Sequence, residues 1–373
     1  MRVVFLIGNY GTGGKERQLT EIIKRLPKDK FQIHLFMKCD NSFYFSSIKS
    51  HLTSYFSLDK DHFNLLDILA LKQYNKSIQP DVLFSFSTTL SHYAFLLKFF
   101  GRFDYRLING SIRDAPVKFN SVLRMERILY KFYREIVSNS YAGLLAYKQS
   151  VKKFSKVLYN GFDMSRIPKK NKYDLRKLIG IDEKFTVIMV GSMYASKDQN
   201  SFILAANEVL NLDNDVQFFL IGSGPRKHLY EAQVRSFGIE ENVFFKEIVN
   251  NVEDFFKASD LSVLTSASWH GEGIPNVVLE SLACGTPVIA TDNGGTKEIL
   301  KDNFNGYLIN NGDYKTLADK ILFLKRNITK LESFSLNGVE TVVERFTIEK
   351  MMLSFEKIIN ESIGDRSIFP KSV

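Results

Sequence analysis

The sequence predicts an α/β protein with two Rossmann-like, doubly wound parallel-sheet domains. Short apolar runs alternate with helical patterns through both halves of the chain, and this order of elements is typical of parallel sheets. A charged, apolar-poor linker, Lys169–Asp174, separates the halves. The chain has 373 residues, which is enough for two domains of ordinary size. We therefore expect one domain over residues 1–168 and a second over residues 169–345.

The first half opens with a strand, a glycine-rich loop and a helix. The strand is expected over Arg2–Ile7 and the loop over Gly8–Gly14, and a helical pattern runs from Arg17 to Leu26. Ligands of such domains bind beyond the carboxyl ends of the strands. The loop lacks the G-x-G-x-x-G spacing and a P-loop lysine, so neither dinucleotide nor P-loop binding is expected.

The remaining strands are expected from short apolar runs, each followed by a loop or a helical pattern. In the first half they are expected at Gln32–Met37, Val82–Phe86, Tyr105–Ile108 and Glu135–Ser138. In the second half they are expected at Phe185–Val190, Val216–Ile221, Val243–Phe245, Leu261–Leu264 and Val288–Ala290. A final helical pattern covers about Ile348 to Ile359.

Composition and charge indicate where the protein works and which ligands it could bind. Hydrophobic residues make up 45% of the sequence, ample for packed cores, and no run of about 18 apolar residues could span a membrane. The opening apolar run is too short for a signal peptide, and two cysteines, Cys39 and Cys284, favour a reduced, cytoplasmic setting. The net charge of +9 admits phosphorylated ligands, an anionic membrane or nucleic acid. Nucleic acid is not expected, because no zinc-finger spacing, RRM signature or arginine-rich tract is present.

The most informative motif is Glu272–Glu280, which reads Glu-Gly-Ile-Pro-Asn-Val-Val-Leu-Glu. Pro275 suits the first position of a helix, where its missing N–H costs nothing, and Gly285 suits the end of that helix. Backbone N–H groups at a helix start favour a phosphate. Glu272 precedes this anion site, and Glu280 lies about a turn and a half inside the helix.

Two carboxylates beside a phosphate site suggest a ligand with hydroxyl groups on both sides of a phosphate. A carboxylate accepts hydrogen bonds from hydroxyls, and a nucleotide-sugar has hydroxyls on its ribose and on its sugar. For either residue alone the ordinary alternative is stronger, with Glu272 in a surface loop and Glu280 on a solvated helix face. The combined motif favours the nucleotide-sugar site.

The Glu-x7-Glu spacing resembles the signature of retaining GT-B glycosyltransferases, most closely those of glycosyltransferase family 4. Gly13–Arg17 resembles the Gly-Gly-Ala-Glu-Arg element of that family, with Lys15 in place of a small residue. Asn160–Asp163 resembles its Asn-Gly-Val-Asp element. The resemblance implies the GT-B fold, in which two domains face each other across a cleft. It also implies that a C-terminal helix, about residues 346–373, packs back on the first domain.

The resemblance also implies roles for individual residues. Glu280 would bind the ribose hydroxyls, Glu272 the sugar hydroxyls, and Lys197 the diphosphate as a point charge. The alternative for Lys197 is a solvated surface lysine. Glu272, Lys197 and Asn109 form the expected catalytic set. The expected donor-binding residues are Gly13, Gly14, Gly191, Ser192, Lys197, Gly222, Ile248, Glu272, Gly273, Ile274, Pro275, Asn276 and Glu280.

Two positions depart from the family pattern. Relatives usually carry an arginine where this chain has Ser192, so one of the two cations that hold the diphosphate is missing. Many relatives place a histidine after the fourth strand of the first domain, where this chain has Asn109. An amide cannot act as a base, so Asn109 is expected to hydrogen-bond to the transferred sugar. Arg113 or Asp114 is the alternative for that polar role.

The implied reaction transfers a sugar from a nucleoside-diphosphate-sugar, with a UDP-sugar as the expected donor, to an acceptor hydroxyl with retention of configuration. Lys197 and helix N-termini would stabilise the leaving diphosphate without a metal. Asp213–Asp215 fits the Asp-x-Asp pattern of manganese-dependent glycosyltransferases, but it precedes the strand at Val216, opposite the expected site. It is interpreted as a turn, and neither a metal nor another cofactor is expected.

Two kinds of alternative function remain open, another enzyme of the same architecture and a protein without activity. A nucleotide-sugar epimerase or a phosphorylase can share the GT-B architecture, but such epimerases lack the Glu272–Glu280 motif, and phosphorylases need a pyridoxal-phosphate lysine and are usually much longer. An inactive homologue that only binds nucleotide-sugar is suggested by Ser192 and by the missing histidine.

The acceptor is expected to be a glycan or a lipid-linked intermediate of cell-surface polysaccharide or glycolipid synthesis, at the inner face of the plasma membrane. An apolar helix face edged with cations can dock on an anionic membrane surface, and Leu123–Arg134 has this pattern. Its apolar residues are Leu123, Ile128, Leu129, Phe132 and Tyr133, and its basic residues are Arg124, Arg127, Lys131 and Arg134. The alternative is a helix that packs on the sheet. That interpretation is preferred for the similar pattern in Ala94–Phe103.

Overall fold

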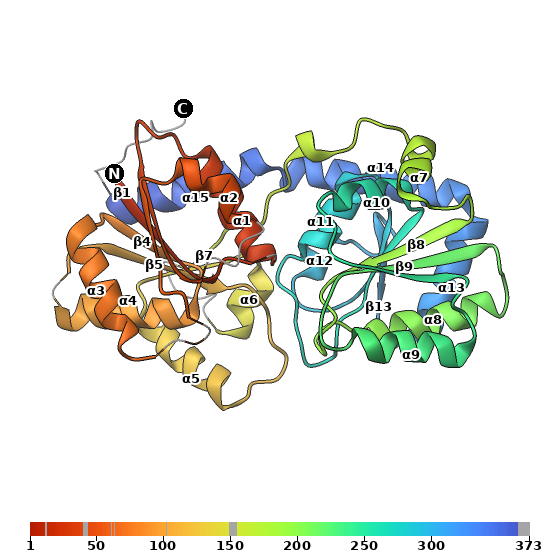
Figure 1. Ribbon diagram of the computed structural model, residues 1–373, viewed down its shortest axis with the longest axis horizontal. Helices are drawn as coiled ribbons and strands as arrows, with labels where there is room; N and C mark the ends of the chain where they lie inside the picture. The colour runs from red at the N-terminus through yellow and green to blue at the C-terminus, as the bar shows by residue number, and fades with distance from the viewer. Residues whose placement is uncertain are drawn as a thin grey trace. The chain divides into compact units, whose positions relative to one another are not determined.

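The computed structural model describes residues 1–11, 13–39, 44–60, 62, 64–101, 103–148 and 155–364. The chain forms two compact units (Figure 1). Unit 1 comprises residues 1–115, residues 119–160 and the segment from Ile348 onward, and unit 2 comprises residues 116–118 and 161–347. The boundary suggested by the sequence, between residues 168 and 169, falls a few residues inside unit 2. The predicted C-terminal segment, residues 346–373, lies outside the described residues beyond residue 364.

Unit 1 contains a seven-stranded parallel sheet in the order β3-β2-β1-β4-β5-β6-β7. Its strands are β1 (Arg2–Asn9), β2 (Gln32–Cys39), β3 (Ser54–Ser57), β4 (Val82–Ser85), β5 (Arg106–Ile112), β6 (Glu135–Ser138) and β7 (Ser155–Val157). Every strand predicted for this half is present. The sequence missed β3 and β7 because they are short edge strands whose half-buried or exposed side chains form no apolar run.

Helices cover both faces of this sheet (Figure 1). They are α1 (Gly14–Arg25), α2 (Phe45–Ile48), α3 (Asp67–Ile78), α4 (Thr88–Gly101), α5 (Ser121–Leu129), α6 (Tyr141–Ala146) and α15 (Ile348–Ile363), with 3₁₀ turns η1 (Lys49–His51) and η2 (Tyr130–Phe132). Alternate side chains of a strand point to opposite faces. In β1, Phe5 and Ile7 belong to the core formed with α1 and α15, whereas Val4 and Leu6 belong to the core formed with α3 and α4.

Unit 2 contains a six-stranded parallel sheet in the order β10-β9-β8-β11-β12-β13. Its strands are β8 (Phe185–Val190), β9 (Val216–Ile221), β10 (Val243–Lys246), β11 (Leu261–Leu264), β12 (Val288–Thr291) and β13 (Gly306–Ile309). The sequence missed only β13 in this sheet, because a four-residue strand that begins with glycine gives a weak strand signal.

The helices of unit 2 are α7 (Lys172–Ile179), α8 (Gln199–Leu210), α9 (Lys227–Phe237), α10 (Val252–Ala258), α11 (Asn276–Ala283), α12 (Thr296–Ile299), α13 (Tyr314–Arg326) and α14 (Ile328–Arg345), with the 3₁₀ turn η3 (Met164–Arg166). They form a core on each face of the sheet. Val187 of β8 lies in one core and its neighbour Ile188 in the other. Each unit is therefore a doubly wound α/β fold.

The C-terminal helix α15 belongs to unit 1, although the chain reaches it from unit 2. Its residue Phe355 is fully buried. The ring centroid of Phe355 lies 6.2 Å from that of Phe5 and 5.5 Å from that of Phe84. The helix thus covers the two central strands β1 and β4.

Phe355→Ala is expected to destabilise unit 1, because removing a buried ring leaves a cavity and such substitutions cost about 3–5 kcal/mol. Leu353→Ala, on the same helix but with 65% of the residue exposed, is the matched control. Thermal unfolding followed by circular dichroism should show a clearly lower midpoint for the first variant only. Equal midpoints would contradict the packing of α15 on the sheet.

Candidate active site

Lys197 and Glu272 lie in loops that follow two neighbouring strands of unit 2. The strands β8 and β11 pair in parallel, so their carboxyl ends meet at one edge of the sheet. Lys197, in the loop after β8, forms an isolated antiparallel bridge with Ser266, in the loop after β11. The Ala267 N–H also donates to the Ser196 carbonyl over 3.0 Å. Backbone hydrogen bonds therefore join the two loops beyond the strands.

The Glu272 carboxylate is buried, and its polar contacts converge on one oxygen. Only 7% of the residue is exposed. Its Oε1 accepts a hydrogen bond from Ser266 Oγ over 2.6 Å and pairs with Lys197 Nζ. His270 Nε2 lies 3.8 Å from the same oxygen. Oε2 accepts no hydrogen bond from any described residue, so it is the oxygen with an acceptor left for a ligand hydroxyl.

The surroundings of Glu272 favour its ionised form. Burial by itself would raise the pKa of this carboxyl group, but the Lys197 ammonium, His270 and the hydrogen bonds outweigh burial and lower the pKa below its ordinary value. The Lys197 side chain is itself only 18% exposed. The two residues form a largely buried ion pair, in which each charge depends on the other.

The loop after β12 also contacts the Glu272 backbone. The Gly295 N–H donates to the Glu272 carbonyl over 2.7 Å. Gly294 has a φ of +58°, and a Cβ at this position would overlap the Glu272 backbone. A larger residue than glycine therefore cannot replace Gly294 without moving the loop.

The helix that was predicted after Glu272 is α11, and it carries the second glutamate of the motif. The helix begins at Asn276 with Pro275 as its N-cap, one residue later than predicted. It ends where predicted, with Gly285 at a φ of +76°. Glu280 is 3% exposed. Since both glutamates of the motif are buried, the alternative of a surface loop residue and a solvated helix face is wrong.

The remaining donor-binding predictions in unit 2 lie on nearby loops. Gly222 has a φ of +146°, and a Cβ there would overlap the Gly191 carbonyl, so glycine lets the loop after β9 approach the loop after β8. Ser192 is exposed, and its carbonyl accepts a hydrogen bond from Gln199 over 2.9 Å. Ile248, in the loop after β10, is 48% exposed. Gly273 and Ile274 are buried between Glu272 and the start of α11.

The structure corrects the position predicted for Asn109. The strand β5 continues to Ile112, so Asn109 lies inside the sheet instead of in the following loop, and it is fully buried. Its Oδ1 accepts hydrogen bonds from Ser91 Oγ over 3.0 Å and from Ser111 Oγ over 2.7 Å. Its Nδ2 has no partner among the described residues. The sugar contact predicted for Asn109 stays a prediction.

The charges of Arg113 and Glu16 influence each other, which the sequence did not reveal. Arg113 follows β5, and its guanidinium lies 4.4 Å from the centre of the Phe86 ring. Burial lowers the pKa of Arg113 to about 10, and the Glu16 charge opposes this shift. Glu16, on α1 two residues beyond the exposed Gly14, is 4% exposed, and burial raises its pKa. The two residues are far apart in the sequence, so no local pattern could pair them.

The Asp213–Asp215 segment forms the predicted turn before β9. Lys325 Nζ donates to both carboxylate oxygens of Asp213, over 2.7 and 2.8 Å, and to the Asp215 carbonyl over 2.9 Å. The hydrogen bond from Lys325 is the main reason why the pKa of Asp213 is lowered. The segment lies at the start of β9, at the end of the sheet opposite Lys197 and Glu272.

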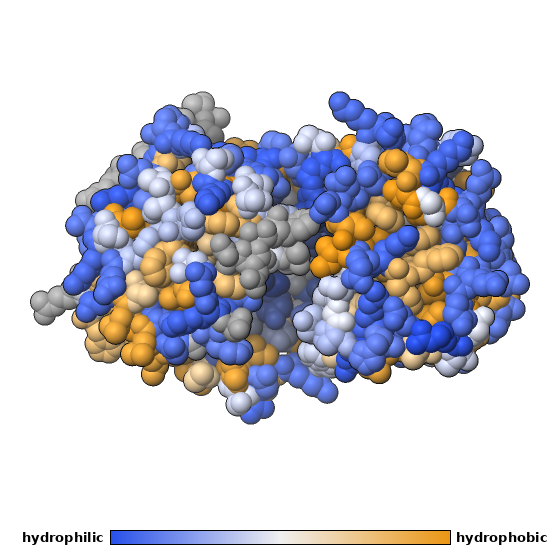
Figure 2. Space-filling view, in the orientation of Figure 1, coloured by the Kyte–Doolittle hydropathy of each residue, from blue (hydrophilic) through white to orange (hydrophobic). Residues whose placement is uncertain are grey.

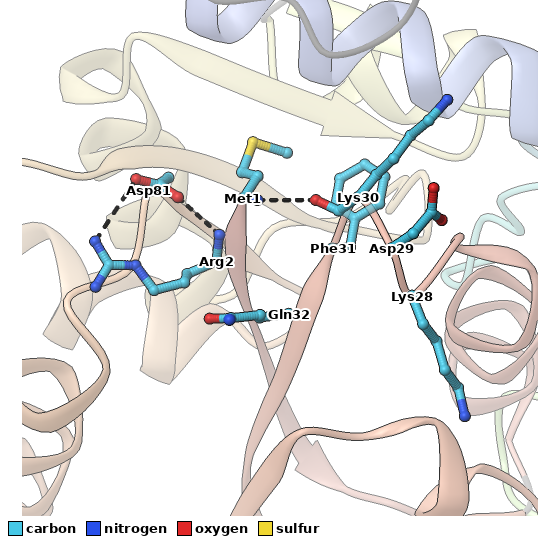
Figure 3. Close-up of a pocket in the computed structure, with 8 residues that line it drawn as sticks. All are labelled: Met1, Arg2, Lys28, Asp29, Lys30, Phe31, Gln32 and Asp81. Atoms are coloured by element: carbon cyan, nitrogen blue, oxygen red, sulfur yellow. Dashed lines mark hydrogen bonds and ion pairs between the residues drawn. The ribbon is translucent and has the colours of Figure 1, made fainter.

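A cavity of about 450 Å³ lies at the amino ends of β1 and β2 in unit 1 (Figure 3). Its lining residues are Met1, Arg2, Lys28, Asp29, Lys30, Phe31, Gln32 and Asp81. Figure 3 shows Arg2 paired with Asp81, and the Met1 amino group donates to the Lys30 carbonyl over 2.8 Å. Ligands of doubly wound sheets bind at the other end, beyond the carboxyl ends of the strands. The cavity is therefore not the candidate site.

Lys197→Met is expected to destabilise unit 2 at pH 7 by about 3–5 kcal/mol, because it leaves a buried carboxylate unpaired. Adding Glu272→Gln should recover most of this loss. Because the pKa of Glu272 is lowered in the folded state, the ion pair contributes fully to the free energy of unfolding above pH 4.5, the ordinary pKa of the group. This contribution is lost as the pH falls through the pKa of Glu272 in the folded state. The difference between wild type and Lys197→Met should therefore shrink at low pH.

Thermal unfolding of wild type, the two single variants and the double variant at pH 7 and pH 4 measures this coupling. If the loss of stability in the double variant at pH 7 equals the sum of the losses in the two single variants, Lys197 and Glu272 are not coupled.

Comparison with known proteins agrees with this site. The family described as glycosyl transferases group 1 matches residues 171–340, which include Lys197, Glu272 and Glu280. The chain is 28% identical over 208 residues to N-acetyl-alpha-D-glucosaminyl L-malate synthase of Bacillus anthracis, a match that covers 56% of this chain and 54% of the relative. The chain thus spans about half the length of this relative.

A longer match joins the chain to a transferase that acts on a lipid-linked glycan. The chain is 27% identical over 323 residues, 81% of this chain and 84% of the relative, to N-acetylgalactosamine-N,N'-diacetylbacillosaminyl-diphospho-undecaprenol 4-alpha-N-acetylgalactosaminyltransferase of Campylobacter jejuni. Among solved structures, Anabaena Alr3699/HepE in complex with UDP and glucose superposes with a TM-score of 0.84 at 22% identity, over 96% of this chain and 99% of that one.

These matches agree with the two doubly wound sheets and with the Glu-x7-Glu motif. The chain has the GT-B fold, it resembles GT-B glycosyltransferases, and its residues 171–340 match the glycosyl transferases group 1 family.

Proposed function

We propose that the chain is a retaining glycosyltransferase that moves a sugar from a nucleoside-diphosphate-sugar, with a UDP-sugar as donor, to a glycan or lipid-linked acceptor. The observation that carries this proposal is the buried Lys197–Glu272 pair at the carboxyl ends of β8 and β11, next to the start of α11. The Bacillus anthracis and Campylobacter jejuni relatives, whose names describe a synthase and a transferase of amino sugars, support it.

The chemistry follows from the charges at this edge of the sheet. Breaking the bond between sugar and diphosphate leaves negative charge on the diphosphate, and a cation with a helix N-terminus can stabilise that charge. Lys197 and the start of α11 supply both. The unengaged oxygen of Glu272 would accept a hydroxyl of the sugar. With serine at position 192, Lys197 is the cation that this loop offers the diphosphate.

The acceptor class rests on the names of the relatives. The Campylobacter jejuni relative and an Escherichia coli galactosyltransferase, 29% identical over 203 residues, are both named for diphosphoundecaprenol-linked substrates. A nucleotide-sugar epimerase and an inactive nucleotide-sugar-binding homologue are the competing functions. An epimerase would convert the donor without releasing a nucleoside diphosphate, and an inactive homologue would bind the donor unchanged.

The wild-type chain should bind one member of a panel of UDP-, GDP- and ADP-sugars and slowly release its nucleoside diphosphate. Glu280→Gln should weaken binding of both nucleotide and nucleotide-sugar by about ten- to a hundredfold, because a charged hydrogen bond to the ribose contributes about 1.5–3 kcal/mol. Glu272→Gln should reduce turnover with less effect on nucleotide affinity. Calorimetry and a nucleoside-diphosphate release assay measure these effects.

Controls in the same assay separate the alternatives. Glu349→Gln, on the C-terminal helix of unit 1, should behave as wild type. Excess EDTA should leave activity intact, since Lys197 and the start of α11 would stabilise the charge of the diphosphate without a metal. Activity that is lost on chelation and returns with manganese would overturn the metal-free mechanism. Binding without release would favour the inactive homologue.

We also propose that unit 1 docks on an anionic membrane surface, where a lipid-linked acceptor would lie. No helix in the described part of the chain is long and apolar enough to cross a bilayer. Instead, apolar side chains point outward from two helices. This apolar surface comprises Leu96, Phe99 and Phe100 of α4, Val122, Met125 and Ile128 of α5, and Phe132 of η2, each between 37% and 75% exposed. Figure 2 shows apolar residues gathered over α3 and α4.

The structure revises which residues of the predicted segments face outward. Tyr133 is only 4% exposed, and Leu123 is partly buried, whereas Ile128 and Phe132 are 56% and 65% exposed. The prediction that Ala94–Phe103 packs on the sheet is wrong at its C-terminal end, because Phe99 and Phe100 are 71% and 75% exposed.

Ring contacts join α4 to the residue that follows η2, and basic residues lie near the exposed apolar side chains. Phe95 of α4 packs against Phe99 and Tyr133, with ring centroids 6.3 and 5.2 Å apart. The exposed cations Arg124 and Lys131 lie beside the apolar residues of α5 and η2. Apolar side chains flanked by cations suit a membrane with anionic lipids, where each basic residue contributes about 1 kcal/mol.

The wild-type chain should co-float with anionic vesicles and not with zwitterionic ones, and the binding should fall as salt screens the charges. Replacing Arg124, Arg127, Lys131 and Arg134 by Gln should weaken flotation. Phe99→Ser with Phe100→Ser should do the same without changing the net charge. Leu336→Ser, at a residue of unit 2 that is 72% exposed, is the matched control. A wild-type chain that stays in the soluble fraction with anionic lipid at low salt would rule out docking.

A further inference from the structure

The loop between β11 and α11 presents the single tryptophan of the chain beside the candidate site. Trp269 precedes Glu272 by three positions and is 46% exposed. Among the described residues its ring contacts that of His270, with centroids 5.9 Å apart at an interplanar angle of 63°. A tryptophan carries a large apolar area that proteins usually bury. Its exposed indole close to the Lys197–Glu272 pair is therefore a candidate contact for a ligand that binds there.

Hydrogen bonds to the backbone hold the loop below Trp269 in place. The buried Asn293 side chain donates to the Ala267 carbonyl over 3.2 Å and also to the His270 carbonyl. The His270 N–H closes a turn by donating to the Ala267 carbonyl over 3.0 Å. Asn311 Nδ2 donates to the Ser266 carbonyl over 2.7 Å. The indole thus projects from a fixed turn, which lowers the entropy cost of binding a ligand against it.

The strand order tells which part of a nucleotide-sugar would reach Trp269. In this sheet β8 separates β9 and β10 on one side from β11 on the other. Gly222 and Ile248, two of the expected donor-binding residues, follow β9 and β10, and Lys197 follows β8. A ligand with its base at β9 and β10 and its diphosphate at Lys197 would therefore extend its sugar toward Glu272 and Trp269.

We propose that Trp269 is the surface on which the ring of the donor sugar stacks, and that it selects among donors of the hexopyranose class. A hexopyranose has C–H groups on its ring faces and hydroxyls at its edges. The C–H groups carry slight positive charge and suit the negative face of an indole. The hydroxyls would then point toward Glu272 Oε2 and His270. This inference rests on the proposed function and assigns the choice of sugar to one loop.

Because Trp269 is the only tryptophan, its fluorescence reports on this position alone. Acrylamide should quench the emission of the unliganded wild-type chain, since the indole is half-exposed. Saturating UDP-glucose, UDP-galactose or UDP-N-acetylglucosamine should protect it, and the sugar that protects best should be the best donor. Saturating UDP should leave the quenching unchanged. Equal protection by UDP and by every UDP-sugar would place the nucleotide at Trp269 and overturn the proposal.

Variants test the same assignment by affinity. Trp269→Ala should raise the Kd of the best UDP-sugar about fivefold and leave the Kd of UDP within a factor of two, whereas Trp269→Phe should restore part of the loss. Phe323→Ala, at an aromatic residue of α13 that is 43% exposed, is the matched control and should change neither Kd. Calorimetry gives each Kd independently of the fluorescence.

The outcomes distinguish this inference from the proposed function. If the wild-type chain binds a UDP-sugar and releases UDP, but Trp269→Ala leaves both Kd values unchanged, the function stands and the stacking surface does not. A variant that weakens UDP and UDP-sugar equally also overturns the inference. If neither UDP nor any UDP-sugar binds the wild-type chain, the proposed UDP-sugar donor fails together with the inference.

Discussion

A carboxylate buried beside a lysine constrains the whole functional edge of unit 2. Glu272 and Lys197 are 75 residues apart in the sequence, and neither charge is well solvated where it lies. Burying one charge without the other would be strongly unfavourable, so the loops after β8 and β11 must stay together. Two backbone contacts hold these loops in place. One is the bridge between Lys197 and Ser266, and the other is the hydrogen bond from Gly295 to the Glu272 carbonyl. The site is therefore arranged before any ligand arrives.

Glycine makes this arrangement possible at two close approaches of the backbone. At Gly294 and at Gly222 a Cβ would overlap a neighbouring backbone, that of Glu272 in the first case and that of Gly191 in the second. Both residues also have positive φ values, which other residues rarely adopt. The loops after β9 and β12 can thus pack on the loops beside them and support Lys197 and Glu272 from both sides.

The two units expose surfaces of different chemistry. In unit 2, polar groups gather at the carboxyl ends of β8 and β11, where Lys197, Ser266 and His270 surround one glutamate oxygen. In unit 1, apolar side chains of α4 and α5 are exposed, and the Glu16 carboxylate is buried. The first surface suits a charged small molecule, and the second suits an apolar partner with negative charge at its surface.

The sequence by itself determined the regular elements and the glutamate motif, because apolar periodicity, helix ends and glycine positions are local properties of the chain. It predicted the other strands of both sheets and α11, but it missed the edge strands β3 and β7, which are short and only half-buried or exposed, and β13, a short strand that begins with glycine. Only the tertiary structure decided that Lys197 pairs with Glu272, that Asn109 is enclosed inside β5, and that Phe99 and Phe100 face outward. These facts depend on which strands become neighbours and how far each helix extends past its sheet, and contacts between distant segments leave no local pattern in a single sequence.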